Sequence, residues 1–261
     1  MSKLLGKVIV TGNIKVLTGM RIGGSGGGLK IGGVDLNVIT DPFGTPYIPG
    51  SSLKGKTRSI MERYHSRPFN DRGIHLCQSD SDYNNCPVCK IWGTMAGASR
   101  MNSSTITRLL VSDVFLDRES ITTEMQSNLE LRWTEVKFET AINRISGTAS
   151  GTGSLRQIER VPAGAVFKDM RMIFNVFAEE DKNLLKEIFI ALELLEHDYL
   201  GGMGSRGYGR VGFGDMKVFW NSHKAYDTGD ISPESQRAIN GDASTPQAIV
   251  KDFEQIIKGL N

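Results

Sequence analysis

Three cysteines and one histidine stand close together in the chain and could hold a metal ion. Cys86 and Cys89 are separated by two residues, a spacing that structural zinc sites commonly use, and Cys77 lies nine residues before Cys86. His75 is the predicted fourth ligand. The side chains that could take its place are Asp80, Asp82 and His65. We predict a structural zinc site that orders the polar residues 67–100, with three buried free thiols as the alternative.

A single carboxylate follows a glycine-rich segment near the amino end of the chain. Residues 19–33 hold eight glycines, so we expect a loop whose backbone lies close to another molecule. Asp35 comes directly after this loop. At such a position it is either a turn residue or a group that acts on a polyanion, by orienting a 2′-hydroxyl or by holding a divalent ion near a phosphate. Position alone leaves both interpretations open.

Residues 50–57 match the phosphate-binding pattern of nucleotide-binding loops, with glycine, four residues and then Gly-Lys-Thr. Three prolines between residues 41 and 49 argue against the buried parallel strand that must precede such a loop. We predict instead a capped helix start with a basic face, which binds phosphates of a nucleic-acid strand without reading its sequence. The residues expected there are Ser51, Ser52, Lys54 and Arg58.

The charge of the chain is unevenly distributed. Residues 1–64 hold nine Lys and Arg against three Asp and Glu, whereas the whole chain has a net charge of only +2. This predicts one face for an anionic polymer or, alternatively, a solvated lysine face. No segment approaches the ~20 apolar residues of a membrane helix and no secretory signal is recognised, so we expect a cytoplasmic protein without a membrane partner.

The elements that must position these residues follow from hydrophobic periodicity. Apolar alternation predicts a strand pair or one long strand over residues 4–17, and an apolar stripe predicts a helix over residues 181–199. A second glycine-rich loop covers residues 201–210. Further strands are expected at residues 107–116, 133–138, 165–177 and 211–220, then a mobile connector at 222–243 and a helix at 245–258. This order predicts an α+β fold, an antiparallel sheet with helices on one face.

Several motifs together resemble the RAMP superfamily, and most closely the repeated backbone subunit of type III-A CRISPR effector complexes. These are GMRIGG at 19–24, DP at 41–42, PYIPGSSLKG at 46–55, CPVC at 86–89, RQIER at 156–160 and the loop at 201–209. The resemblance implies a modified ferredoxin-like sheet, similar to the RNA-recognition motif, over residues 1–220. It also implies a zinc-bearing lid at about 67–100 and a thumb at about 113–165. Residues 221–261 form the connector and the carboxy-terminal helix.

The resemblance also implies a function. Copies of the chain would stack along a guide RNA beside other CRISPR effector subunits, and each would cut target RNA at six-nucleotide intervals with Asp35 and a divalent ion such as magnesium or manganese. The implied zinc ligands are the four residues named above, His75, Cys77, Cys86 and Cys89. The implied RNA contacts are Arg21, Ser51, Ser52, Lys54, Arg58, Arg144, Arg156, Arg160, Arg206 and Tyr208.

Two departures from the family pattern bear on this expectation. The family often has histidine where Arg21 stands, and the run between Arg144 and Arg156 is longer and richer in glycine than the usual thumb tip. Two other functions stay open. One is a non-catalytic backbone subunit, and the other is a guide-RNA-processing endoribonuclease, which usually relies on histidine or tyrosine near the first helix, where only His65 stands.

Overall fold

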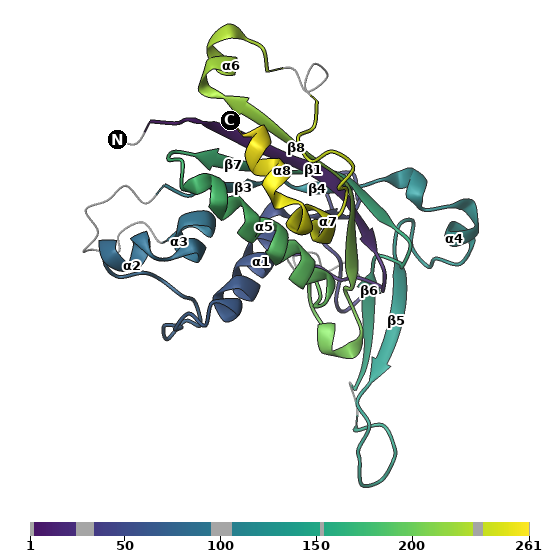
Figure 1. Cartoon of the computed structure of the whole chain (residues 1–261). Coiled ribbons are helices and arrows are strands. Elements are labelled where there is room, and N and C mark those ends of the chain that lie inside the picture. Colours follow the sequence, from purple (N-terminus) through teal and green to yellow (C-terminus); the bar gives the residue numbers. More distant parts are fainter. Residues whose placement is uncertain (1–2, 25–33, 95–105, 152–153, 232–236, 261) are drawn as a thin grey trace.

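A six-stranded antiparallel sheet forms the body of the protein in a computed structural model, which describes residues 3–24, 34–94, 106–151, 154–231 and 237–260. The strands run in the order β2-β4-β7-β1-β8, and β3 also pairs with β7 (Figure 1). Their bounds are β1 Gly6–Val16, β2 Tyr47–Ile48, β3 Leu109–Val111, β4 Val114–Leu116, β7 Val166–Val176 and β8 Val211–Ser222. The central strand β1 is one long strand whose alternate apolar residues are buried, as its periodicity predicted.

Helices cover one face of this sheet (Figure 1). They are α1 Gly50–Tyr64, α5 Asp181–Glu196, α7 Pro246–Lys251 and α8 Phe253–Gly259. The apolar stripe predicted for residues 181–199 lies on the buried face of α5, where Leu185, Phe189 and Leu192 are fully buried. The expected single helix at 245–258 is wrong, because Asp252 leaves the helical conformation with ψ at 35° and separates α7 from α8.

The first turn of α1 differs from its prediction. The residue preceding the helix is Pro49, and Ser51 and Ser52 lie inside the helix, so neither is its cap. A carboxylate far away in the chain takes that role, because the Gly50 backbone N–H donates to Asp113 Oδ1 at 2.7 Å. The preceding β2 is a two-residue antiparallel strand rather than a buried parallel strand, which confirms that residues 50–57 are not a nucleotide-binding loop.

A separate two-stranded hairpin projects from the body (Figure 1). It consists of β5 Glu135–Thr140 and β6 Leu155–Arg160, and we call these strands with their connection the hairpin. β5 was expected, but β6 was not, because its sequence LRQIER is dominated by polar residues. The short helices before it are η1 Arg118–Ser120 and α4 Thr123–Ser127.

Two segments expected to be irregular contain ordered structure. The cysteine segment holds α2 Asp80–Asn84 and α3 Pro87–Trp92. The expected mobile connector contains α6 His223–Thr228 and the buried Asn240, whose side chain accepts from the Val218 N–H and donates to Met216 O. Residues 25–33, 95–100 and 152–153 of the predicted loop, lid and thumb lie outside the described residues. Within the described ranges, no helix has both the length and the apolar composition to cross a membrane.

Candidate functional site

The described parts of the two glycine-rich loops lie against each other and form one continuous surface. The Gly202 N–H donates to Arg21 O at 2.9 Å, and the Gly209 N–H donates to Gly19 O at 3.1 Å. Gly201 has a positive φ of 86°, and a Cβ atom there would collide with the Arg21 carbonyl oxygen. Glycine is therefore required at this position for the two backbones to approach.

Tyr208 joins the second glycine-rich loop to the hairpin. Its hydroxyl donates to Glu139 Oε1 at 2.7 Å. Two cations lie over its ring, Lys137 with Nζ 4.7 Å from the ring centroid and the Arg160 guanidinium at 5.1 Å. The hydrogen bond from Tyr208 lowers the pKa of Glu139, and burial raises the pKa of Tyr208, so the contact joins a carboxylate to a neutral phenol.

Asp35 lies on the outer edge of the hairpin and is exposed. Its Oδ2 accepts from the Gln157 N–H at 2.8 Å, and the next residue, Leu36, pairs in parallel with Ile158. Glu159 continues this attachment, because its Oε2 accepts from the Val38 N–H at 2.8 Å. The segment that carries Asp35 is thus hydrogen-bonded along β6, on the edge that β5 leaves free.

The four predicted metal ligands come together in one buried cluster. The ligand atoms of His75, Cys77, Cys86 and Cys89 all lie within 4.8 Å of one another. His75 Nδ1 lies 3.0 Å from Pro68 O, which leaves Nε2 facing Cys86 Sγ at 3.4 Å and Cys77 Sγ at 3.6 Å. This arrangement is typical of a metal-bound histidine, whose second ring nitrogen donates to a carbonyl.

The thiols of the cluster differ in their pKa values. A hydrogen bond from the Cys89 thiol lowers the pKa of Cys86 to about 4, whereas burial raises the pKa of Cys77 to about 11. The Cys89 N–H also points at Cys86 Sγ, at 3.4 Å. Three sulfurs and one nitrogen are the donor set that tetrahedral zinc prefers, so the cluster could bind zinc.

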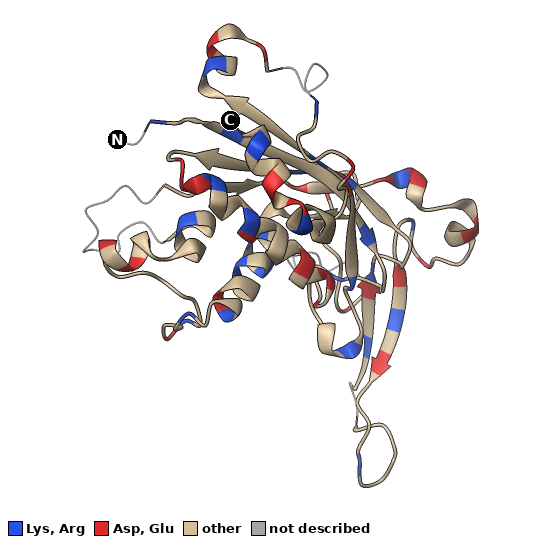
Figure 2. Cartoon of the chain, viewed as in Figure 1, with Lys and Arg blue, Asp and Glu red and all other residues tan. Residues whose placement is uncertain are grey.

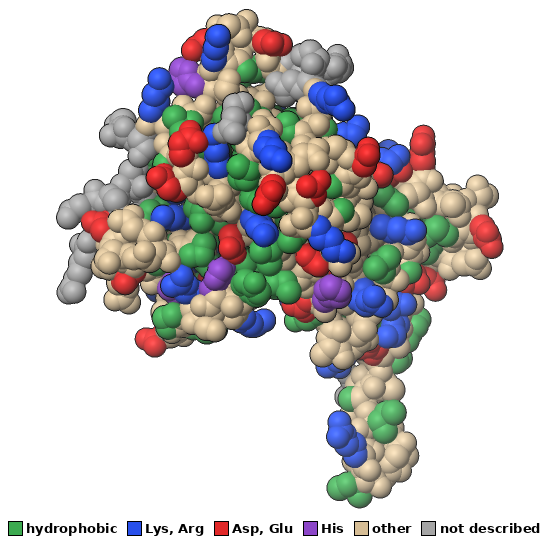
Figure 3. Space-filling view, in the orientation of Figure 1, with side chains coloured by type: hydrophobic (Ala, Val, Ile, Leu, Met, Phe, Trp, Pro, Cys, Tyr) green, Lys and Arg blue, Asp and Glu red, His purple; other side chains and the backbone are tan. Residues whose placement is uncertain are grey.

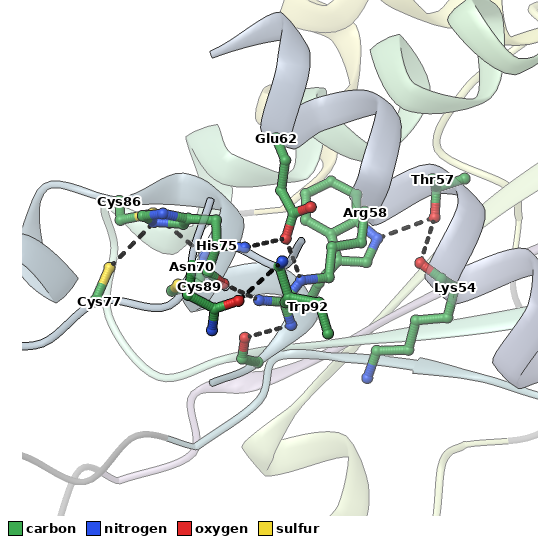
Figure 4. A network of polar contacts seen from close by, with 12 residues as sticks. Lys54, Thr57, Arg58, Glu62, Asn70, His75, Cys77, Cys86, Cys89 and Trp92 are labelled. Atoms are coloured by element: carbon green, nitrogen blue, oxygen red, sulfur yellow. Dashed lines mark hydrogen bonds and ion pairs between the residues drawn. The ribbon is translucent and has the colours of Figure 1, made fainter. Parts of the chain in front are cut away.

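Helix α1 is tied to this cluster by Arg58 (Figure 4). Arg58 donates to His75 O at 2.6 Å, to Gly93 O at 2.9 Å and to Glu62 Oε1 at 2.8 Å. Trp92 adds a second link, because its Nε1–H donates to Thr57 Oγ1 at 3.0 Å. The guanidinium of Arg58 is therefore directed toward the cysteine segment.

A protein-family profile matches most of the chain. The RAMP superfamily profile matches residues 13–212. The chain belongs to the RAMP superfamily. This confirms the resemblance seen in its motifs.

Individual RAMP relatives are similar over nearly the whole length. The curated "CRISPR system Cms endoribonuclease Csm3" of Methanocaldococcus jannaschii is 38% identical over 259 residues, covering 99% of this chain and 97% of that protein. The protein of the same name from Streptococcus thermophilus is 38% identical over 217 residues, covering 81% and 89%.

Solved structures with the same fold were also found. A Csm3–Csm4 subcomplex of the type III-A CRISPR-Cas interference complex contains a chain that is 28% identical, with a TM-score of 0.57 and coverage of 97% of both chains. The crystal structure of Methanopyrus kandleri Csm3, 20% identical, has the same fold, with a TM-score of 0.65 and coverage of 99% of both chains.

The predicted RNA contacts of this RAMP protein differ in exposure. Arg144, Arg156, Arg206 and Ser51 are exposed, and Arg21 and Ser52 are half-buried. Arg206 also lies 3.7 Å from Glu139 Oε2. The remaining four are held by protein contacts: Arg58 and Tyr208 as described, Arg160 by an ion pair with Glu135 at 2.6 Å, and Lys54 by donation to Leu109 O at 2.9 Å. Burial, followed by the charge of Arg58, lowers the pKa of Lys54. Burial also lowers the pKa of Arg21, while the charge of Glu159 opposes that shift.

The site contains three acidic residues that sequence reasoning missed, namely Asp113, Glu139 and Glu159. The sequence pointed to cations as RNA ligands. It did not indicate that these carboxylates accept hydrogen bonds within the protein. Glu139 and Lys137 alternate on one strand, a pattern that could have indicated a paired charged face. For Asp113, the sequence offers no local signal, because its partner Gly50 is distant in the chain.

Proposed function

We propose that this chain is a guide-RNA-binding backbone subunit of a type III-A CRISPR effector complex that cuts target RNA at six-nucleotide intervals with Asp35. The observation that carries the proposal is the exposed Asp35 carboxylate, fixed to the edge of a projecting hairpin beside the surface of the two glycine-rich loops. The full-length similarity to proteins named CRISPR endoribonuclease supports the same activity.

We also propose a more detailed description of the fold. The chain order β1, α1, β4, β7, α5, β8, with the sheet order β4-β7-β1-β8, supports a modified ferredoxin-like sheet over residues 1–220. We assign residues 67–100 to a zinc-bearing lid and residues 221–261 to a carboxy-terminal extension. The thumb expected at 113–165 begins after β4, at about residue 117, because β4 belongs to the main sheet. The cluster of His75, Cys77, Cys86 and Cys89 supports zinc in the lid.

The hairpin is suited to separate a guide from its target. It presents four exposed apolar side chains, Phe138, Ile142, Ile145 and Leu155, and Ile145 at the tip is 99% exposed. Figure 3 shows hydrophobic and basic side chains on the projecting part of the hairpin. Apolar side chains that enter a base stack unstack neighbouring bases and bend the backbone. We infer that this tip displaces a base pair and thereby splays the target strand.

Cleavage would then depend mainly on geometry. A carboxylate is a weak base for a ribose hydroxyl, so positioning must supply much of the rate. In a splayed strand, the 2′-oxygen can align with the adjacent phosphorus, attack it and expel the 5′-oxygen of the next nucleotide. Asp35 would orient the hydroxyl and accept its proton. A divalent magnesium or manganese ion would stabilise charge on the phosphate, and the exposed carboxylate oxygen is a ligand of the hard type that such ions prefer.

The proposed partners are guide RNA, target RNA, further copies of this chain and other effector subunits in the cytoplasm. The solved Csm3–Csm4 subcomplex supports assembly with a second kind of subunit. We assign phosphate contacts to Arg21, Ser51, Ser52 and Lys54 on the body, with Arg206 on the second loop and Arg144 and Arg156 on the hairpin. Guide-RNA processing is disfavoured, because His65 Nε2 is engaged by Glu187 Oε2 at 2.8 Å.

The decisive experiment is the Asp35→Ala variant in the reconstituted complex, with end-labelled target RNA and magnesium. We expect cutting to fall by about a hundredfold or more while guide and target affinity stay unchanged. Asp230→Ala, which removes another exposed carboxylate, is the matched control and should cut normally. Equal cutting by Asp35→Ala and wild type would leave a non-catalytic backbone subunit as the function.

A further inference from the structure

We propose that Tyr208, acting through Glu139, is a positioning residue that fixes the Asp35-bearing hairpin against the second glycine-rich loop and so sets the rate and position of RNA cleavage. This inference rests on the proposed function. It gives Tyr208 a role inside the protein instead of the direct RNA contact that the family resemblance implied. Tyr208 is 1% exposed, so its ring is not available for stacking on a base in this structure.

The hairpin needs such a contact because it is not part of the main sheet. Two-stranded hairpins have little intrinsic stability, so their direction depends on what holds their base. One attachment lies at the end of β6, where Val161 pairs with Met20. The segment that carries Asp35 adds contacts at Gln157, Ile158 and Glu159, which are also on β6. The bond from Tyr208 to Glu139 provides a second point of attachment, on β5, and the Arg206 guanidinium lies 3.7 Å from the other oxygen of the same carboxylate.

The second point lies level with Asp35. Glu139 is opposite Arg156 in the ladder between β5 and β6, and the neighbouring Phe138 is opposite Gln157. The Gln157 N–H is the group that donates to Asp35. The loop therefore holds β5, and β6 holds Asp35, at adjacent rungs of the same hairpin. A tilt of the hairpin at Glu139 would move the Asp35 carboxylate with it.

Tyr208 is itself firmly placed. Gly207 and Gly209 on either side have positive φ values of 84° and 76°, and a Cβ atom on Gly209 would collide with the Leu200 carbonyl oxygen. Two cations, Lys137 and Arg160, lie over the ring. The position of the hydroxyl is thus set by the loop backbone and by the ring contacts before it reaches Glu139.

The test compares Tyr208→Phe with wild type in the reconstituted complex. The substitution keeps the ring and its contacts with Lys137 and Arg160 and removes only the hydroxyl. We expect kcat for target cleavage to fall about tenfold, with KM and guide affinity unchanged within about twofold, and the cut positions to spread over neighbouring nucleotides. Tyr226→Phe, which removes the hydroxyl of a tyrosine on α6, is the matched control and should behave as wild type.

A second measurement does not depend on activity. Hydrogen exchange at the Gln157 amide should be faster in Tyr208→Phe, because its acceptor Asp35 is no longer held in register, whereas exchange in β1 should be unchanged. Glu139→Gln keeps an acceptor for the hydroxyl and should lose less than Tyr208→Phe in both measurements. Glu139→Ala removes the acceptor instead of the donor and replaces Tyr208→Phe if the latter fails to assemble.

The outcomes separate the two proposals. If Asp35→Ala cuts as well as wild type, the proposed catalytic function fails. If Asp35→Ala is inactive while Tyr208→Phe retains the wild-type kcat, cut positions and Gln157 exchange, only the positioning role fails. A raised KM with unchanged kcat would also overturn it, because that result would mark Tyr208 as an RNA-binding residue.

Discussion

At the scale of single residues, Lys54 and Arg58 share one face of α1 but differ in their surroundings. Lys54 makes one contact to the Leu109 carbonyl oxygen, whereas Arg58 is engaged by two carbonyl oxygens and by Glu62, which is 3% exposed. Removing Arg58 would leave the buried Glu62 carboxylate without its cation. The two cations should therefore respond differently to the same substitution.

We predict that Arg58→Ala lowers the free energy of unfolding by about 3 kcal/mol, because it breaks a largely buried ion pair and leaves one charge unpaired. Urea unfolding of the isolated chain measures this. If Arg58→Ala is as stable as wild type and only its guide binding is weakened, Arg58 is an RNA-binding residue and not a structural one.

Lys54→Ala should affect RNA rather than stability. We expect guide affinity to fall alike for all sequences, with the slope of log affinity against log salt reduced by about 0.7 for one lost phosphate contact. Lys224→Ala on α6 is the control. A loss confined to particular guide sequences, with an unchanged slope, would contradict a phosphate contact.

At the scale of elements, we predict that the cysteine segment depends on a bound metal for its order. Helices α2 and α3 have five and six residues, too short to be stable alone. We expect one zinc ion per chain by elemental analysis, and chelation should raise hydrogen exchange throughout α2 and α3 while β1 stays protected. A freshly purified, metal-free chain with both helices protected would restore the interpretation of three buried thiols.

The tip of the hairpin makes a separate prediction. Ile145→Asp places a charge on the most exposed apolar residue, so we expect guide binding to be unchanged and target cuts to lose their regular spacing. Ile231→Asp, at a partly exposed isoleucine outside the hairpin, is the control. Products of unchanged spacing and rate from Ile145→Asp would mean that the tip does not position the target.

Some elements of the fold could be predicted from the sequence and others could not. β1, α5 and the metal cluster were predictable, because apolar periodicity and ligand spacing are local signals. β6, α2 and α3 were not, because β6 is mostly polar and pairs with a distant strand, and α2 and α3 are too short to show an apolar period. The contact of Asp113 with the start of α1 and the contact of Tyr208 with Glu139 join residues far apart in the chain, so no local sequence pattern predicts them.

At the scale of the whole molecule, the basic amino-terminal quarter does not become one uniform basic face. Lys56 pairs with Asp198 at 2.9 Å, and Lys7 donates to Asn175 at 2.6 Å near the start of β1. Lys15 lies near the other end of the same strand. In Figure 2 the positions of basic and acidic residues are interspersed along the ribbon of the body, and both kinds also occur on the hairpin. Any RNA path must therefore be set by a few placed cations and by the glycine-rich backbone, not by bulk charge.

The attachment of Asp35 to β6 has a consequence for changes in chain length. The bonds that hold Asp35 and Glu139 all lie on the body side of Thr140 and Leu155. Insertions or deletions between these two residues would alter how far the hairpin reaches into a duplex but would leave the carboxylate where it is. The length of the hairpin and the placement of Asp35 can thus be varied independently, which makes residues 141–154 the natural place to graft tips of other lengths.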